Sequence, residues 1–197
     1  MFRAICIVFL LMLAMAGAQA RHHHYEEDAS PILTVGDIQF VIPSSWQAVP
    51  PAGPARVGQW NVPPAADQGP DGIEIAVYFF GPGVGGSVKD NIDAWSGTIT
   101  APDGSNAPSA PQKRTIAGHV VTEVLFTGTY AKPGKLPGLP PTPKSNYALL
   151  GAVVESPGGN IYWCVTGPAG QVLALAPILD KVLDSLKPHA PAPAPKP

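Results

Sequence analysis

The chain has 197 residues and a formal net charge of −2, and only 13 % of its residues are charged. This length is sufficient for one domain with a real core, and the slightly acidic balance argues against a nucleic-acid partner, which needs a basic face. Proline and glycine are abundant, at 25 and 21 residues. They concentrate in four stretches that we expect to be loops and a tail, namely residues 49–64, 101–111, 132–143 and 188–197.

The first twenty residues have the pattern of a secretory signal peptide. Arg3 gives a positive start, an uncharged apolar run continues to Ala16, and Ala18-Gln19-Ala20 is a small-x-small cleavage pattern. The apolar run is shorter than the about 20 residues that a membrane span needs. We therefore expect cleavage before Arg21, an exported periplasmic or extracellular protein, and no stable membrane span after cleavage.

Residues 21–31 read as a flexible polar leader that contains three consecutive histidines, His22, His23 and His24. Cleavage would leave a free amine on Arg21 with a histidine at the third position. Such a set of nitrogen ligands suits the square-planar geometry of Cu(II) or Ni(II). Copper or nickel binding by these histidines is therefore one alternative function, and a polar leader without a metal role is the other interpretation. No cofactor is expected.

Runs rich in β-branched and aromatic residues predict strands along most of the chain. The predicted strands are residues 32–42, which form a hairpin turning at Gly36-Asp37, and residues 55–62, 73–80, 112–116, 119–130, 147–155 and 160–166. Hairpin-like connections dominate, so the sheet should be mostly antiparallel.

Two helices are predicted. The first follows Ser87, which can form a capping box with Asp90, and it ends by Gly97. The second covers residues 169–186, where Pro177 should kink the helix or restart it because proline lacks the backbone donor. The fold class is therefore α+β: a mostly antiparallel sheet flanked by helices in a single domain.

Several segments carry a resemblance to a known family. They are Pro43-Ser44-Ser45-Trp46 and residues 56–60 (RVGQW), 78–95 (YFFGPGVGGSVKDNIDAW), 128–130 (GTY), 147–157 (YALLGAVVESP), 163–168 (WCVTGP) and 184–187 (DSLK). Together they resemble uncharacterised exported bacterial proteins related to the PsbP fold. The resemblance implies a PsbP-like α/β/α sandwich over residues 32–187, followed by a disordered Pro/Ala-rich tail at 188–197. It also implies a non-catalytic assembly or stabilising role.

Few residues suggest catalysis. His119 and Glu123 share one face of a strand by alternation, and a small hydrolase that uses them as a base and its orienter is a second alternative. A surface contact is the other interpretation of this pair. The thiol of Cys164, in an apolar strand, should be buried and inert. No catalytic residue is assigned.

The glycine loop, residues 81–86, fits G-x-G-x-x-G between a strand and a helix. It lacks the parallel βαβ unit of a dinucleotide site, so we interpret it as a tight connection. The four tryptophans are expected to anchor the core or a smaller cluster beside it rather than to line a pocket; they are Trp46, Trp60, Trp95 and Trp163.

The leading hypothesis is a non-catalytic interaction or accessory module of the bacterial envelope, with an envelope protein or a small ligand as its partner. Three surfaces are candidates: the glycine loop, the groove between sheet and helix, and residues 132–144, which we call the lysine loop. A polyproline-like segment presents a stiff surface at low entropic cost. The partner-binding residues expected in the lysine loop are Lys132, Lys135, Leu136, Leu139 and Lys144.

Overall fold

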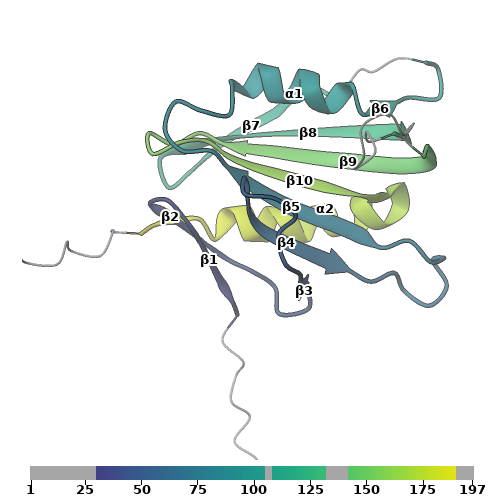
Figure 1. Cartoon of the computed structure of the whole chain (residues 1–197), viewed down its shortest axis with the longest axis horizontal. Coiled ribbons are helices and arrows are strands. Elements are labelled where there is room, and N and C mark those ends of the chain that lie inside the picture. The colour runs from purple at the N-terminus through teal and green to yellow at the C-terminus, as the bar shows by residue number, and fades with distance from the viewer. Residues whose placement is uncertain (1–29, 105–107, 132–141, 190–197) are drawn as a thin grey trace, which may run out of the picture.

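A computed structural model describes residues 30–104, 108–131 and 142–189 of the chain (Figure 1). The predicted signal peptide lies outside these ranges. So do most of the predicted metal-binding and partner-binding residues, namely His22, His23, His24, Lys132, Lys135, Leu136 and Leu139.

The larger of two sheets forms the centre of the described structure. Its strands lie in the order β3-β4-β5-β10-β9-β8-β6, with β7 also paired to β8. Every neighbouring pair is antiparallel, as predicted. The bounds are β3 Gln47–Ala48, β4 Arg56–Val62, β5 Ile73–Phe79, β6 Ile99–Thr100, β7 Gln112–Ile116, β8 His119–Tyr130, β9 Lys144–Val154 and β10 Ile161–Pro168.

A small sheet brings the two ends of the domain together. It has the order β1-β2-β11, with β1 Ile32–Val35 and β2 Ile38–Val41 as the predicted hairpin and β11 Lys187–Pro188 added at the edge. The backbone N–H of His189 donates to the carbonyl of Asp37 at 2.6 Å. The predicted start of the tail at Pro188 is therefore too early. Proline is tolerated there because an edge strand does not need every backbone donor.

Each helix begins and ends close to its predicted bounds. Helix α1, Val88–Ser96, opens with the predicted capping box: the N–H of Asp90 donates to Ser87 Oγ at 3.1 Å, and the N–H of Ser87 donates to Asp90 Oδ2 at 2.8 Å. Helix α2, Ala169–Asp184, continues through Pro177 as one helix, so the predicted restart does not occur.

The two helices pack on opposite faces of the large sheet (Figure 1). Successive side chains of a strand point to opposite faces. Leu150 of β9 accordingly belongs to the main core under α2, whereas the adjacent Leu149 belongs to a smaller cluster that includes Trp95 of α1. The structure is thus the expected single α+β domain, an antiparallel sheet flanked by helices.

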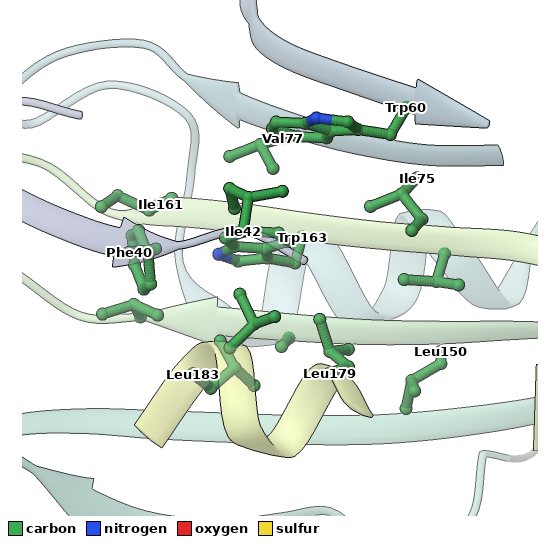
Figure 2. Packing of buried hydrophobic residues seen from close by; sticks show 14 of the residues in the cluster. Phe40, Ile42, Trp60, Ile75, Val77, Leu150, Ile161, Trp163, Leu179 and Leu183 are labelled. Carbon is green, nitrogen blue, oxygen red and sulfur yellow. The ribbon is translucent and has the colours of Figure 1, made fainter. Parts of the chain in front are cut away.

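Trp163 lies at the centre of the main core (Figure 2). Its side chain is fully buried and stacks on Trp60, with ring centroids 6.4 Å apart, and it meets the edge of Phe40 at 5.2 Å. Leu179 and Leu183 of α2 point toward it from below the sheet. In the described part of the chain, no helix is both long and apolar enough to cross a membrane.

Candidate functional site

A groove with a volume of about 210 Å³ lies between α1 and the exposed face of the sheet. Strands β5, β10, β9 and β8 form its floor, and α1 with the residues after it forms one wall. Five of its nine lining residues are aromatic and none carries a charge at neutral pH in its ordinary state. The lining residues are Tyr78, Phe80, Asn91, Trp95, Thr98, Tyr130, Leu149, Tyr162 and Cys164.

Strand register brings the floor residues together. Tyr78 of β5 pairs directly with Tyr162 of β10, and Cys164 follows Tyr162 on the same face by alternation. Leu149 of β9 is held on this face by its pairing with Phe126 of β8. The floor thus collects side chains that are far apart in the sequence.

Trp95 forms the wall of the groove by packing on the sheet at a glycine. A Cβ atom at Gly151 would lie only 2.3 Å from Cζ3 of the Trp95 ring, so the indole lies against the bare backbone of β9. Trp95 packs against the smaller hydrophobic cluster and also lines the groove, whereas Trp46, Trp60 and Trp163 are buried in the main core as predicted. Helix α1 contains no fully buried residue, so its tryptophan is left half-exposed at the groove.

The glycine loop closes one end of the groove. The hydroxyl of Tyr162 donates to the carbonyl of Gly86 at 2.8 Å, and Asn91 Nδ2 donates to the carbonyls of Gly85 and Ser87 at 2.8 and 3.0 Å. Gly85 has φ +95°, and a Cβ there would meet the Tyr162 hydroxyl oxygen at 2.8 Å. A side chain would be strained and would clash, which supports the interpretation of this loop as a tight connection.

Tyr130, which lines the groove, pairs with Lys144, the last residue of the lysine loop. Tyr130 stacks on Tyr147, with centroids 6.0 Å apart. The Tyr147 hydroxyl donates to Asp71 Oδ2 at 2.7 Å, and Lys144 Nζ lies 3.0 Å from both of those oxygens. These hydrogen bonds lower the pKa of Asp71, and the bond from Tyr147 has the larger effect, followed by the bond from Lys144. Lys144, an expected partner-binding residue, therefore makes an internal contact.

Burial sets the protonation of the groove tyrosines. It raises the pKa of the Tyr130 phenol strongly and that of the Tyr78 phenol as well. Both groups therefore stay neutral at physiological pH and keep a hydroxyl donor. The guanidinium of Arg56, 5.2 Å above the Tyr78 ring, forms an ion pair with Glu74 at 3.3 Å, so its charge is already compensated beside the groove.

The structure gives His119 and Glu123 separate partners. His119 Nδ1 lies 3.0 Å from the carbonyl of Glu155, while Glu123 accepts from Nε of Arg114 at 3.0 Å. The carboxylate that was expected to orient the histidine is thus bound to an arginine. Among the described residues, no group of three or more His, Cys, Asp and Glu side chains could hold a metal ion.

Cys164 differs from its expected place. Its side chain is half-buried in the groove, not fully buried. Alternation is the reason: the adjacent Trp163 takes the core face of β10, so Cys164 must take the face beneath α1.

The groove between sheet and helix was predicted as a candidate surface, but none of the residues in its floor was predicted to lie there. The available signal was a pair of aromatic residues at alternate positions, Tyr78 in β5 and Phe80 directly after the strand. Without the register of the neighbouring strands, this alternation does not show which side chains lie beside them.

Comparisons with known proteins yield similarity of structure only. No family model matches the chain, and no curated protein matches it. Among solved structures, cyanobacterial PsbP (CyanoP) from Synechocystis sp. PCC 6803 is 15 % identical with a TM-score of 0.49 over 82 % of this chain and 94 % of that chain. LpqN, described as involved in cell envelope biogenesis of Mycobacterium tuberculosis, is 14 % identical with a TM-score of 0.45 over 84 % of this chain and 88 % of that chain.

A protein of unknown function from Pseudomonas aeruginosa is a third similar structure, at 11 % identity and a TM-score of 0.41 over 84 % of this chain and 99 % of that chain. Cyanobacterial PsbP is thus one of the solved structures to which this chain is similar. These similarities concern architecture, and architecture does not fix function.

Proposed function

We propose that the chain is a non-catalytic binding module of the bacterial envelope and that its binding site is the groove beneath α1. The observation that carries the proposal is the lining: five aromatic side chains converge on a groove with no charged wall residue. Aromatic residues with few polar groups are typical of binding sites. The residues that suggested hydrolysis, His119 and Glu123, have other partners and do not line this groove.

The location in the envelope rests on the first twenty residues, whose pattern is that of a signal peptide. N-terminal sequencing of the protein recovered from the envelope fraction tests it. We expect the sequence to begin at Arg21, and an uncleaved chain in the cytoplasm would contradict the proposal.

The lysine loop extends the proposed binding surface. It leaves β8 after Tyr130, which lines the groove, and returns at Lys144. Lys132, Lys135, Leu136 and Leu139 would then contact the same partner as the groove. Lys144 would contribute by holding the end of the loop against Asp71.

Affinity capture from envelope extracts tests the groove. The baits are the wild-type protein, the groove variant Tyr130→Ala, a variant with residues 132–141 deleted, and the control Leu173→Asp. Leu173 is 49 % exposed on α2, on the opposite face of the sheet from α1. We expect a partner retained by the wild type and the control but lost by Tyr130→Ala. A partner retained equally by all four baits would contradict a binding role for the groove.

A further inference from the structure

We propose that the groove holds one uncharged aromatic side chain, tyrosine or tryptophan, of a protein partner. This inference rests on the proposed function, since it assumes that the groove is the binding site. It adds the chemical class of the group that is bound and the kind of molecule that supplies it.

The volume of the groove fits one aromatic ring. A closed apolar cavity of about 150 Å³ takes up benzene, and the groove measures about 210 Å³. It has room for a single or fused ring with a small polar group. Pockets for whole drug-sized ligands are larger, at about 300–1,000 Å³. The groove is therefore of the size of one side chain rather than of a complete cofactor.

The chemistry of the walls favours a ring over a sugar. Three polar groups at the groove already donate within the protein: the Tyr162 hydroxyl to Gly86, Asn91 Nδ2 to Gly85 and Ser87, and Thr98 Oγ1 to the carbonyl of Trp95. A sugar would bury several hydroxyl groups that need new partners, and each one left unsatisfied would weaken binding.

The aromatic lining residues can contact a bound ring through their faces and edges. Phe80 stacks with Tyr78 at 6.5 Å and meets Tyr162 edge-on at 5.9 Å. An entering ring can join this set in the stacked or edge-to-face geometry that aromatic pairs prefer. An ionised side chain would lose its hydration without gaining an opposite charge, because no lining residue supplies one. The phenol oxygens of Tyr78 and Tyr130 already accept from Arg56 and Thr166, but each neutral hydroxyl keeps a proton that it can donate to the hydroxyl oxygen of a bound tyrosine.

Apolar surface outside the groove points to a protein as the source of the ring. Phe80 is 43 % exposed at the groove, and Val84 of the glycine loop is 57 % exposed. A free small molecule inside the groove would leave Val84 uncovered. A polypeptide with one anchoring ring would cover it, as in interfaces where a buried aromatic anchor is surrounded by weaker contacts.

Titrations followed by NMR on the isotope-labelled full-length chain test the ring. The probes are N-acetyl-tryptophanamide, N-acetyl-tyrosinamide, N-acetyl-leucinamide and maltose. We expect the two aromatic amides to shift the Trp95 indole N–H and the Gly151 amide, and to bind about tenfold or more tightly than the leucine amide, a factor within the energy of an aromatic pair. Equal binding of the leucine amide would overturn the inference.

A comparison of free indole with the peptide Gly-Trp-Gly tests the source of the ring. The peptide should bind more tightly, because its backbone reaches the surface around Val84. If indole binds as tightly as the peptide, the groove is a small-molecule site and the inference is wrong.

A matched pair of variants locates the binding. Phe80→Ala should weaken the peptide about tenfold. Leu173 of α2 has an exposed fraction similar to that of Phe80, and Leu173→Ala should leave binding unchanged. Equal effects of the two variants would overturn the inference.

The outcomes also separate this inference from the proposed function. If maltose or the leucine amide shifts the NMR signals of Trp95 and Gly151 and the aromatic amides do not, the groove is still a binding site, but its ligand is not an aromatic ring. Absence of any shift, together with a partner that Tyr130→Ala still captures, would reject both.

Discussion

The indole of Trp95 lies against the backbone of Gly151, so that a Cβ at residue 151 would come within 2.3 Å of Cζ3 and 2.5 Å of Cε3. This contact joins α1 to β9, an inner strand of the large sheet. It also sets the depth of the groove, because Trp95 forms its wall and Gly151 lies beside Cys164 in the floor. The absence of one side chain on β9 thus allows the helix to approach.

Gly151→Ala should displace Trp95 and loosen α1. The new methyl group overlaps a rigid ring, and overpacking of this kind costs about 1–3 kcal/mol in the free energy of unfolding. Urea denaturation measures the loss, and hydrogen exchange of residues 88–96 should become faster. Gly170→Ala in α2 is the control, since a Cβ there has no atom within 4 Å. Equal stability of the two variants would show that the Trp95–Gly151 contact has no energetic role.

Ser87→Ala should weaken α1 from its N-terminus. The variant loses the Ser87 Oγ bond to the N–H of Asp90, and loss of such a cap costs about 1 kcal/mol. Hydrogen exchange measured by mass spectrometry should show faster exchange in α1 and an unchanged rate in α2. Ser87→Gly should lose only a few tenths of that energy, about 0.3 kcal/mol, because glycine is accepted at N-caps. Faster exchange across both helices would instead indicate global destabilisation.

Arg114→Met should destabilise the fold by disconnecting β7 from α2. The guanidinium binds Glu123 at 3.0 Å, Asp180 at 3.1 Å, and Asp184. Only 14 % of the Glu123 side chain is exposed, so its carboxylate would lose a charged partner in a half-buried site. Allowing for the partial exposure of the arginine, we expect a loss of about 1–2 kcal/mol. Thermal and urea denaturation measure it.

The loss in Arg114→Met should depend on pH. Burial raises the pKa of Glu123 above its ordinary value of 4.5, so the folded state holds that proton more tightly than the unfolded state. Stability from this group is therefore greatest below about pH 4.5 and falls as pH rises through the raised pKa. Removing Arg114 raises the pKa further. The deficit of the variant should thus grow between about pH 4 and pH 7.

Lys89→Met is the control for this pH dependence. Its ion pair with Asp93 is exposed on both sides, at 81 and 60 %, and exposed pairs contribute little to stability. A deficit of Arg114→Met that stays constant across this pH range would contradict the role given to Glu123.

The Tyr130→Phe variant should gain stability relative to the wild type as the pH rises into the alkaline range. Burial raises the pKa of the Tyr130 phenol above its ordinary value of 10.0, so the unfolded wild type ionises first as pH rises. The folded wild type then loses stability, and the variant lacks this loss. We expect the stability difference to change in favour of the variant between about pH 9 and pH 11. Urea denaturation at both pH values measures it, and an unchanged difference would mean that Tyr130 is solvated in the folded protein.

Much of the fold can be predicted from the sequence because the signals are local. The bounds of β7 and β8 match the predicted ranges 112–116 and 119–130, and the Ser87–Asp90 capping box occurs as expected. The two-residue strands β3, β6 and β11 have no such signal. Each exists only because a distant strand offers backbone partners, so no pattern within two residues can predict it.

The candidate site depends on distant relationships that sequence patterns do not contain. Trp95 was expected to be an anchor and not part of a pocket, and Cys164 was expected to be buried, yet both line the groove. The ion pair of Lys144 with Asp71 was not predicted either, and the predicted partner contact of Lys144 stays a prediction. Alternation tells which residues share a face, but it does not tell which face the helix α1 covers or where an acidic side chain from another loop will lie.

The sequence by itself determined the signal-peptide pattern, the α+β class, the antiparallel hairpins and the start of α1, because each depends on residues a few positions apart. The tertiary structure decided the register of β5, β10, β9 and β8, and with it the aromatic groove. Only pairing across these strands brings Tyr78, Tyr162 and Tyr130 to one face, and only the missing side chain of Gly151 lets Trp95 close that face into a site.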